Sequence, residues 1–328
     1  METIKVVKTA RCVPAKVVTN DDLSKIMDTS DEWISSRTGI KQRHISVGEN
    51  TSQLCAVVAE QLLKKSGWDV ESIDLLLVAT MSPDTYTPAT AALVQGKIGA
   101  HNALAFDISA ACSGFIYGLN VAEKFMTSSG SACNRVMLIG GEVLSKVIDW
   151  TDRTTAVLFG DGAAGVLLER QEDGGASRFI SSSLHTYGEL GDKLEAGKTE
   201  ALVSFPMEGE HKIKAFSMSG RDVYKFATHK VPVSIEEAVK KAGLTLDQID
   251  YFVLHQANSR IVAQIAKRLN QPLAKFPMNI AKYGNTSAAS VPLLLDELVS
   301  DKTIKRGQTI VLSGFGGGLT VGTQIIKY

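Results

Sequence analysis

The apolar residues of this 328-residue chain follow two recurring patterns. Short, nearly continuous apolar runs such as Ile73–Val78 are typical of buried strands. Stretches in which apolar residues return every three or four positions, as at Phe115, Leu119 and Ala122, indicate amphipathic helices, and Glu60–Lys65 is interpreted as another such helix. Gly67 follows that helical stretch and is the residue type that most readily ends a helix. Because helical and strand patterns alternate along the chain, the sequence predicts an α/β fold with largely parallel sheets.

The pattern of the first half returns in the second half. Residues Glu60–Val78 align without a gap with Glu236–Leu254, and both segments contain a helical pattern, a glycine and an apolar run. Similarity at one large spacing indicates that an α/β unit has been duplicated, because a solenoid would repeat at a much shorter period. Two shorter correspondences have a similar spacing: Val136–Ile139 with Ile310–Ser313, and Ser109–Cys112 with Ser287–Ser290.

The length of the chain supports a division into two units, because a single hydrophobic core rarely extends over so many residues. A polar segment with two glycines, Glu172–Gly175, follows the apolar run Gly165–Leu168. We therefore predict a boundary at this segment, with one half at residues 1–172 and the other at residues 173–328.

Composition narrows the class of function. Hydrophobic residues make up 44% of the chain, and 35 basic residues balance 35 acidic ones, so no overall charge favours nucleic acid or an anionic membrane. No apolar run approaches the ~18 residues of a membrane span. We expect a cytoplasmic protein that binds neither nucleic acid nor membrane. Neither the cysteines nor the histidines have metal-ligand spacing, so no metal site is expected. The residues considered are Cys12, Cys55, Cys112, Cys133, His44, His101, His185, His211 and His229.

Residues Gly160–Gly165 match the G-x-G-x-x-G pattern of dinucleotide-binding loops. In such loops a helix follows the glycines, and its N-terminus holds the pyrophosphate. Here the next residues, Val166–Glu169, form another short apolar run that is typical of a strand. We therefore interpret the glycines as a tight turn between strands and expect no nicotinamide cofactor.

Cys112 is the first candidate catalytic residue. The apolar run Leu104–Ile108 predicts a buried strand, and Phe115–Lys124 has helical spacing, so the cysteine is expected at the N-terminus of a helix. The positive end of the helix dipole lowers the pKa of a thiol there and makes it a better nucleophile. The alternative is a small buried side chain, which is the usual role of a free cysteine.

Two distant polar residues complete a candidate nucleophilic site. His255 follows the apolar run Tyr251–Leu254, and Asn285 lies in the small, polar segment Tyr283–Ser290. Each has a simpler interpretation, because a lone histidine is often only hydrogen-bonded, and Asn and Ser are common in loops and helix caps. Cysteine, histidine and asparagine at strand ends or in loops suit nucleophilic catalysis when the fold brings them together.

Together these segments resemble the β-ketoacyl-acyl-carrier-protein synthase III family of thiolase-like condensing enzymes. The similarity extends from about Ile4 to Tyr328. It implies a thiolase-like five-layer α/β/α/β/α sandwich made of two duplicated halves, the first with the cysteine and the second with the histidine and asparagine. The motifs that carry the similarity are Trp33–Ile40, Ala111–Phe115, Phe159–Ala163, His255–Asn258, Gly284–Pro292 and Phe315–Gly318.

The resemblance implies the initiating reaction of type II fatty-acid synthesis in a homodimer. Cys112 would take the acyl group of a short acyl-CoA primer, and malonyl-acyl carrier protein would then lose CO₂ and attack the acyl-cysteine. The backbone N–H groups of Cys112 and Gly317 would form the oxyanion hole, while His255 and Asn285 would stabilise the enolate. No cofactor is implied, because acyl-CoA is a substrate.

The resemblance also implies binding residues for coenzyme A. Trp33, Arg37 and Arg153 match the adenine contacts of the family, and an aromatic plane with a guanidinium can sandwich a purine. The alternative for Trp33 is ordinary core packing. Gly220 and Asn258 match contacts to the pantetheine arm.

Thr87 departs from the family pattern, because several acetyl-preferring relatives have a phenylalanine at this dimer-interface position beside the acyl pocket. Phe315 is assigned to the same pocket. A threonine leaves more volume there, so we expect longer or branched primers to be accepted unless neighbouring side chains refill the space.

Basic residues follow His255 at helical spacing. Arg260 and Lys267, with Lys225 nearby, would attract an acidic carrier protein. The alternative is a solvated helix face. Two other functions also remain open from the sequence: a synthase III-like acyltransferase of secondary metabolism, and a non-catalytic protein that keeps the fold.

Overall fold

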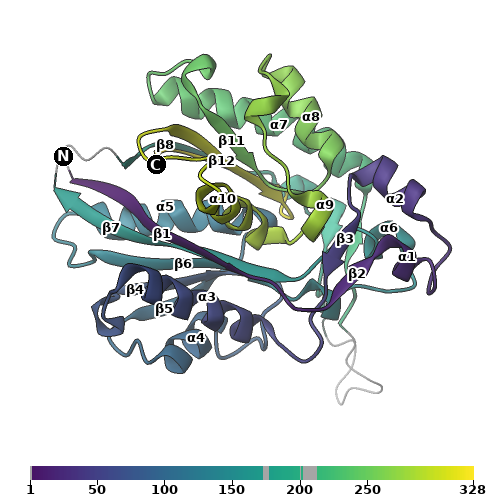
Figure 1. Ribbon diagram of the computed structural model, residues 1–328, viewed down its shortest axis with the longest axis horizontal. Coiled ribbons are helices and arrows are strands. Elements are labelled where there is room, and N and C mark those ends of the chain that lie inside the picture. Colours follow the sequence, from purple (N-terminus) through teal and green to yellow (C-terminus); the bar gives the residue numbers. More distant parts are fainter. Residues whose placement is uncertain (1, 173–176, 200, 202–212) are drawn as a thin grey trace.

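A computed structural model describes residues 2–172, 177–199, 201 and 213–328 (Figure 1). Two β-sheets form its framework. In spatial order, the five-stranded sheet contains β1 (Glu2–Cys12), β7 (Gly162–Glu172), β6 (Arg135–Glu142), β4 (Leu75–Ala79) and β5 (Leu104–Ile108). The four-stranded sheet contains β11 (Tyr251–Leu254), β12 (Thr309–Gly316), β13 (Thr320–Lys327) and β8 (Arg178–Thr186). Two short two-stranded sheets consist of β2 (Val17–Thr19) with β3 (Gln42–His44), and β9 (Leu194–Glu195) with β10 (Ser217–Met218).

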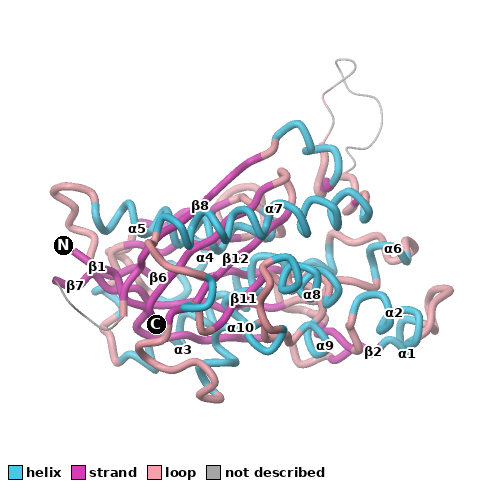
Figure 2. Tube along the Cα trace, turned by 90° about the horizontal axis from the view of Figure 1, so that it is seen from above, coloured by secondary structure: helices cyan, strands magenta, loops and turns pink. Residues whose placement is uncertain are grey.

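Helices form three layers around the two large sheets (Figure 1). The first hydrophobic cluster joins the five-stranded sheet to α3 (Thr51–Ser66) and α4 (Thr90–Ile98). The second lies between the sheets and contains α5 (Gly114–Thr127) and α10 (Ser290–Ser300). The third packs α7 (Gly220–Lys241) and α8 (Ser259–Arg268) on the four-stranded sheet, as Figure 2 shows from above. These layers are the predicted α/β/α/β/α sandwich.

Four short helices gather with β2 and β3 at one end of the molecule (Figure 1). They are α1 (Asn20–Leu23), α2 (Asp31–Thr38), α6 (Arg153–Ala156) and α9 (Ile280–Tyr283). None of the described helices combines the length and the apolar composition that a membrane span requires.

The two large sheets have the same internal order, which supports the predicted duplication. Strands β1, β7, β6 and β4 correspond to β8, β13, β12 and β11, with the same relative directions. The prediction of largely parallel sheets is wrong, because three of the matched strands in each sheet take part in antiparallel pairs: β1, β7 and β6 in one sheet, and β8, β13 and β12 in the other. Among the described strands of the two large sheets, the parallel pairs are β4 with β5 and β6, and β11 with β12. The sheets are therefore mixed.

One predicted correspondence is out of register. The turn that precedes α5 begins at Ala111, with φ 46°, and the turn that precedes α10 begins at Ser287, with φ 49°. These left-handed residues are equivalent in the fold, so Cys112 corresponds to Ala288 and not to Ser290. The boundary predicted after Glu172, the last residue of β7, adjoins residues 173–176, which lie outside the described part of the chain.

Strand β5 was expected to be buried, but it lies at the edge of its sheet. Leu104 at its start is 55% exposed. Apolar composition alone cannot distinguish an edge strand from a central one, since that distinction depends on the order of the strands.

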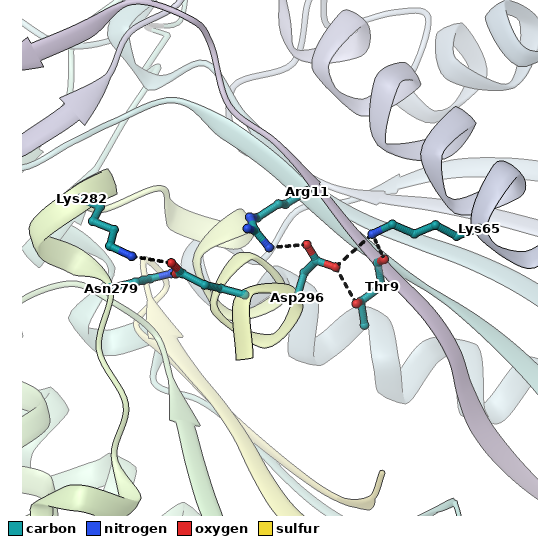
Figure 3. A network of polar contacts seen from close by, with 7 residues as sticks. Thr9, Arg11, Lys65, Asn279, Lys282 and Asp296 are labelled. Carbon is teal, nitrogen blue, oxygen red and sulfur yellow. Dashed lines mark hydrogen bonds and ion pairs between the residues drawn. The ribbon is translucent and has the colours of Figure 1, made fainter. Parts of the chain in front are cut away.

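A buried carboxylate on α10 ties the central helix layer to the five-stranded sheet and to α3 (Figure 3). Asp296 accepts hydrogen bonds from Thr9 Oγ1 on β1 and Arg11 Nη1, both at 2.6 Å. Lys65 Nζ on α3 lies 3.4 Å from Asp296 Oδ1 and donates to the carbonyl of Thr9 at 2.8 Å. Asp296 is only 2% exposed, so these donors stabilise a charge that would otherwise be costly to bury.

Candidate active site

A cavity of about 240 Å³ brings the three candidate catalytic residues together. Cys112, His255 and Asn285 all line it, although they come from distant parts of the chain. Other predicted site residues in the wall are Trp33, Arg37, Gly220, Asn258 and Phe315.

Cys112 lies in the turn Ala111–Ser113, immediately before α5 as predicted. The end of β12 packs against it, and a Cβ atom on Gly316 would lie 2.9 Å from the Cβ of Cys112. Only glycine permits this close approach. The backbone of Gly316 therefore packs directly on Cys112 in the cavity wall.

The pKa of Cys112 does not follow the expectation from the helix dipole. Burial raises it to about 12; the hydroxyl of Ser287 opposes this shift, and the carboxylate of Glu142 adds to it. Cys112 is only 7% exposed, so the loss of hydration outweighs the field of one helix end. The resting cysteine is a thiol.

His255 follows β11 and is held on two sides. Its backbone N–H donates to the carbonyl of Ser313 at 2.8 Å, and its Nδ1 lies 2.6 Å from Ser290 Oγ. The ring of Phe315 packs against the imidazole at a centroid distance of 5.0 Å. Burial lowers the pKa of His255 to about 3, so the imidazole is neutral. When the hydroxyl of Ser290 donates to Nδ1, the proton of the ring is on Nε2.

Asn285 is fixed by its backbone and by its own amide oxygen. Its N–H donates to the carbonyl of Leu158 at 2.9 Å, and its carbonyl accepts from Gly160 N–H at 3.0 Å. Its Oδ1 accepts from the N–H of Ser287 at 2.9 Å, which leaves the NH₂ group to act as a donor. Gly284 before it has φ 66° and ψ −159°, a conformation reserved for glycine.

Three predicted coenzyme A residues cluster beside the cavity. The guanidinium carbons of Arg37 and Arg153 lie 4.6 and 5.2 Å from the centroid of the Trp33 ring. Arg153 does not line the cavity and donates to the carbonyl of Asp28 at 2.7 Å. Trp33 is thus a stacking surface that is already covered by cations.

Asn258 joins the helices on either side of this cluster. As the N-cap of α8, its Oδ1 accepts from the N–H of Arg260 at 2.8 Å, and its Nδ2 donates to the carbonyl of Arg37 at 3.0 Å. Arg260 Nη2 donates to the carbonyl of Ser36 at 2.6 Å. Gly220 begins α7 and also lines the cavity.

Other predicted residues lie outside this cavity. Thr87 is exposed and does not line it. Gly317 lines a neighbouring cavity together with Ala111. Lys225 and Lys267 are exposed on α7 and α8.

Residues Gly162–Glu172 form β7, so no helix follows the glycine pattern that resembles a dinucleotide loop. The expected turn is wrong, because the second and third glycines of the pattern lie within the strand. In the described part of the chain, no three His, Cys, Asp or Glu side chains are grouped as metal ligands would be. His211 lies outside it.

Sequence reasoning missed Ser290 and Glu142. Ser290 belongs to the segment that was singled out around Asn285, so its position was a usable signal. Glu142 follows an apolar run and two glycines, and nothing in that pattern indicates a buried carboxylate beside the cysteine.

The fold and the cavity define a class, the thiolase-fold condensing enzymes. Two family models match the chain, 3-oxoacyl-[acyl-carrier-protein] synthase III at residues 106–188 and its C-terminal region at residues 239–328. The β-ketoacyl-[acyl-carrier-protein] synthase III of Limosilactobacillus reuteri is 56% identical over 328 residues, which is the full length of both chains. The chain therefore belongs to the 3-oxoacyl-[acyl-carrier-protein] synthase III family.

Solved structures agree with this assignment. The crystal structure of 3-oxoacyl-[acyl-carrier-protein] synthase III from Aquifex aeolicus has a TM-score of 0.91 at 39% identity, covering 99% of this chain and 100% of that one. A priming β-ketosynthase from a polyketide biosynthetic pathway has a TM-score of 0.90 at 31% identity, covering 98% and 95%.

Proposed function

We propose that this chain catalyses the initiating condensation of type II fatty-acid synthesis. A short acyl-CoA primer and malonyl-acyl carrier protein give 3-oxoacyl-acyl carrier protein, coenzyme A and CO₂. The observation that carries the proposal is the meeting of Cys112, His255 and Asn285 in one cavity of a chain from this family.

In the first stage, the sulfur of Cys112 attacks the thioester carbonyl of acyl-CoA. The N–H groups of Cys112 and Gly317 then stabilise the oxyanion, and each such donor contributes on the order of 3 kcal/mol. The close packing of Gly316 on Cys112 supports this role, because it brings the glycine-rich backbone next to the backbone of the cysteine.

In the second stage, malonyl-acyl carrier protein loses CO₂ and its enolate attacks the acyl-cysteine. His255 Nε2–H and the NH₂ of Asn285 donate to the enolate oxygen. The neutral imidazole, with Nδ1 beside Ser290 Oγ, suits a donor that does not exchange its proton. The amide of Asn285 is oriented for the same task by its bond from Ser287 N–H.

Coenzyme A binds along the cavity with its adenine at Trp33. The base inserts between the indole and the guanidinium of Arg153 or Arg37, which already stack on that ring. Gly220 and Asn258 contact the pantetheine arm, a role supported by their place in the cavity wall.

The enzyme acts as a homodimer. Strand β5 has an unpaired edge in the described chain, and an edge strand with an exposed leucine is a natural pairing site for a second copy. Thr87 completes the acyl pocket of the partner, while Phe315 lines the pocket of its own chain. The exposure of Thr87 in a single chain supports this division.

An acidic carrier protein docks on Arg260, Lys225 and Lys267, which are exposed on adjacent helices. The reaction takes place in the cytoplasm and needs no cofactor. The two halves of the chain meet between residues 172 and 173, a division supported by the end of one sheet at β7 and the start of the other at β8.

A second candidate function is an acyltransferase of secondary metabolism, which the similarity to the polyketide priming enzyme favours. Steady-state kinetics with a panel of acyl-CoA primers and malonyl-acyl carrier protein test the two. Formation of 3-oxoacyl-acyl carrier protein supports the first. Acylation of the enzyme without condensation onto malonyl-acyl carrier protein supports the second, and no acylation at all contradicts both.

A further inference from the structure

A fully buried carboxylate lies behind the catalytic turn. Glu142, the last residue of β6, has no exposed surface. It accepts hydrogen bonds from Thr80 Oγ1 at 3.1 Å, Met81 N at 3.2 Å, Ser82 N at 3.1 Å and Ser82 Oγ at 2.5 Å. These donors can hold a charge in the interior, but a carboxylate is an unusual residue for so dry a position.

Ser287 acts on both Glu142 and Cys112. It is buried, and its hydroxyl completes no hydrogen bond in the structure. The same hydroxyl lies close enough to both groups to lower the pKa of each against the larger effect of burial. A buried hydroxyl that completes no hydrogen bond, and that acts on both a thiol and a carboxylate, can carry a proton from one to the other.

The fold holds Ser287 in this place. Its turn packs on β6 so closely that a Cβ atom on Gly140 would lie 2.4 Å from the carbonyl oxygen of Ala288. Ser287 itself has φ 49°, a conformation that costs a non-glycine residue about 1–3 kcal/mol. The surrounding contacts therefore fix the turn that contains Ser287 against β6, the strand that ends at Glu142.

Acylation of Cys112 must release a proton, and the site offers few acceptors. His255 is a poor base, because burial lowers its pKa to about 3. A thiolate formed while Glu142 stays ionised would place two negative charges in a buried region. Transfer of the proton to the carboxylate keeps the buried charge at one.

We propose that Glu142 accepts the proton of Cys112 through the hydroxyl of Ser287 and returns it when the cysteine is released. The proposal rests on the proposed function of the cavity, and it assigns Glu142 as the general base of acylation. Ser287 acts as the carrier.

The steps balance. As the S–H bond breaks, Ser287 Oγ takes that proton and passes its own to Glu142, and the sulfur forms a bond to the acyl carbon. The C–S bond to coenzyme A then breaks, and its thiolate takes a proton from water. After the enolate displaces Cys112 from the acyl group, the cysteine thiolate recovers its proton from Glu142 along the same route.

The test is the pH dependence of single-turnover acylation, with Glu142→Gln compared with wild type. Burial raises the pKa of Glu142 to about 7, so the wild-type rate should rise with pH and level off above pH 7. In Glu142→Gln we expect a rate at least ~100-fold lower at pH 7. That rate should keep rising through pH 9, because the pKa of Cys112 is about 12.

Other titratable groups face Glu142 and must be separated from it. They are Cys112 itself, Cys55 on α3 and Lys146 in the turn Leu144–Lys146. Repeating the profile in a Cys55→Ser background isolates the response of Glu142. Glu123→Gln on α5 is the matched control, because it makes the same change at a half-buried carboxylate that does not act on the cysteine.

Ser287→Ala provides a second variant should Glu142→Gln fold poorly, and it should slow acylation in the same way. In both variants, decarboxylation of malonyl-acyl carrier protein should stay within a few-fold of wild type. A wild-type acylation rate in either variant, or a lower rate with an unchanged plateau, overturns the proposal. Wild-type enzyme that is never acylated contradicts the proposed function itself.

Discussion

Cys55 and Cys112 are both buried thiols, but their surroundings differ. Burial raises the pKa of Cys55 well above its usual value, and a Cβ atom on Gly141 would lie 2.2 Å from its sulfur. No acyl group fits there. Cys112 faces the cavity that contains His255.

We therefore expect acyl-CoA to add one acyl group to Cys112 alone. Mass spectrometry of the digested protein locates the label. Cys112→Ala should remove it and abolish condensation, because the second stage then has no electrophile. Label on another cysteine, namely Cys12, Cys55 or Cys133, would contradict the assignment.

His255 and Asn285 should matter more for the second stage than for the first. Alanine at either position removes one donor to the enolate oxygen, so we expect malonyl decarboxylation to fall by about 100-fold or more. Acylation of Cys112 should change much less. Decarboxylation and acylation assays on the same preparations separate the stages, and equal losses in both would argue for a general disturbance of the cavity.

At the residue level, spacing identified the three polar residues of the cavity but not their protonation. Cys112 stands at the helix start that the pattern around it predicts, yet its pKa moves the other way. Burial depends on contacts made by residues far apart in the sequence, such as Gly316. For the same reason the role of Glu142 could not be predicted. A glutamate after a strand pattern is normally exposed, and the role proposed for Glu142 depends on the turn at Ser287, which packs against it only in the folded chain.

At the level of elements, α7 and α8 present the basic residues of the proposed docking surface. The guanidinium of Arg260 already donates a hydrogen bond to the carbonyl of Ser36. Lys267 is exposed at the end of α8. Reversing both charges should raise the Michaelis constant for malonyl-acyl carrier protein on the order of 10-fold and spare that for acyl-CoA.

The effect of that charge reversal should fade as salt rises, because exposed charges are screened. Lys64→Glu is the matched control, since Lys64 is exposed at the end of α3 in the opposite outer layer. A similar loss with malonyl-CoA in place of the carrier protein would mean that the surface is not used for docking.

Several elements were predicted closely because their signals are local. The apolar runs at Leu104–Ile108 and Tyr251–Leu254 coincide with β5 and β11. Their neighbours and directions could not be predicted, since strand order is decided by contacts between segments that the pattern does not relate. The edge position of β5 and the mixed pairing of both sheets are therefore features that the sequence pattern could not predict.

At the level of the whole molecule, Asp296 on α10 links three layers, because its partners lie on β1 and on α3. Asp296→Ala leaves the hydroxyl of Thr9 without its acceptor and removes the partner of Arg11 and Lys65. Because both cations remain partly hydrated, we expect a loss of about 1–3 kcal/mol in the free energy of unfolding. Urea unfolding measures it.

The neighbouring ion pair provides the control for that experiment. Lys282 Nζ lies 2.7 Å from Glu297 Oε1, but the lysine side chain is 63% exposed. Lys282→Ala should cost less than about 1 kcal/mol, as is usual for surface pairs. Equal losses of unfolding free energy at the two positions would mean that Asp296 stabilises the fold no more than a surface ion pair does.

A substitution at Thr87 tests both the assembly of the dimer and the specificity for the acyl primer. It is exposed and does not line the cavity of its own chain, so its effect on the acyl pocket requires a second copy. If Thr87 projects into the partner's pocket, Thr87→Phe should fill space there, and overpacking costs roughly 1–3 kcal/mol. Turnover with long or branched primers should then fall about 5- to 150-fold relative to acetyl-CoA.

A mixed dimer shows whether Thr87 acts on the acyl pocket of its own chain or on that of its partner. In a pair of one Cys112→Ala chain and one chain with an intact cysteine, only the second chain can be acylated. Thr87→Phe placed on the Cys112→Ala chain should restrict the primers of the intact site, and the same change placed on the active chain should not. The reverse result would mean that Thr87 acts within its own chain, and equal loss for all primers would mean that it supports the dimer and not the pocket.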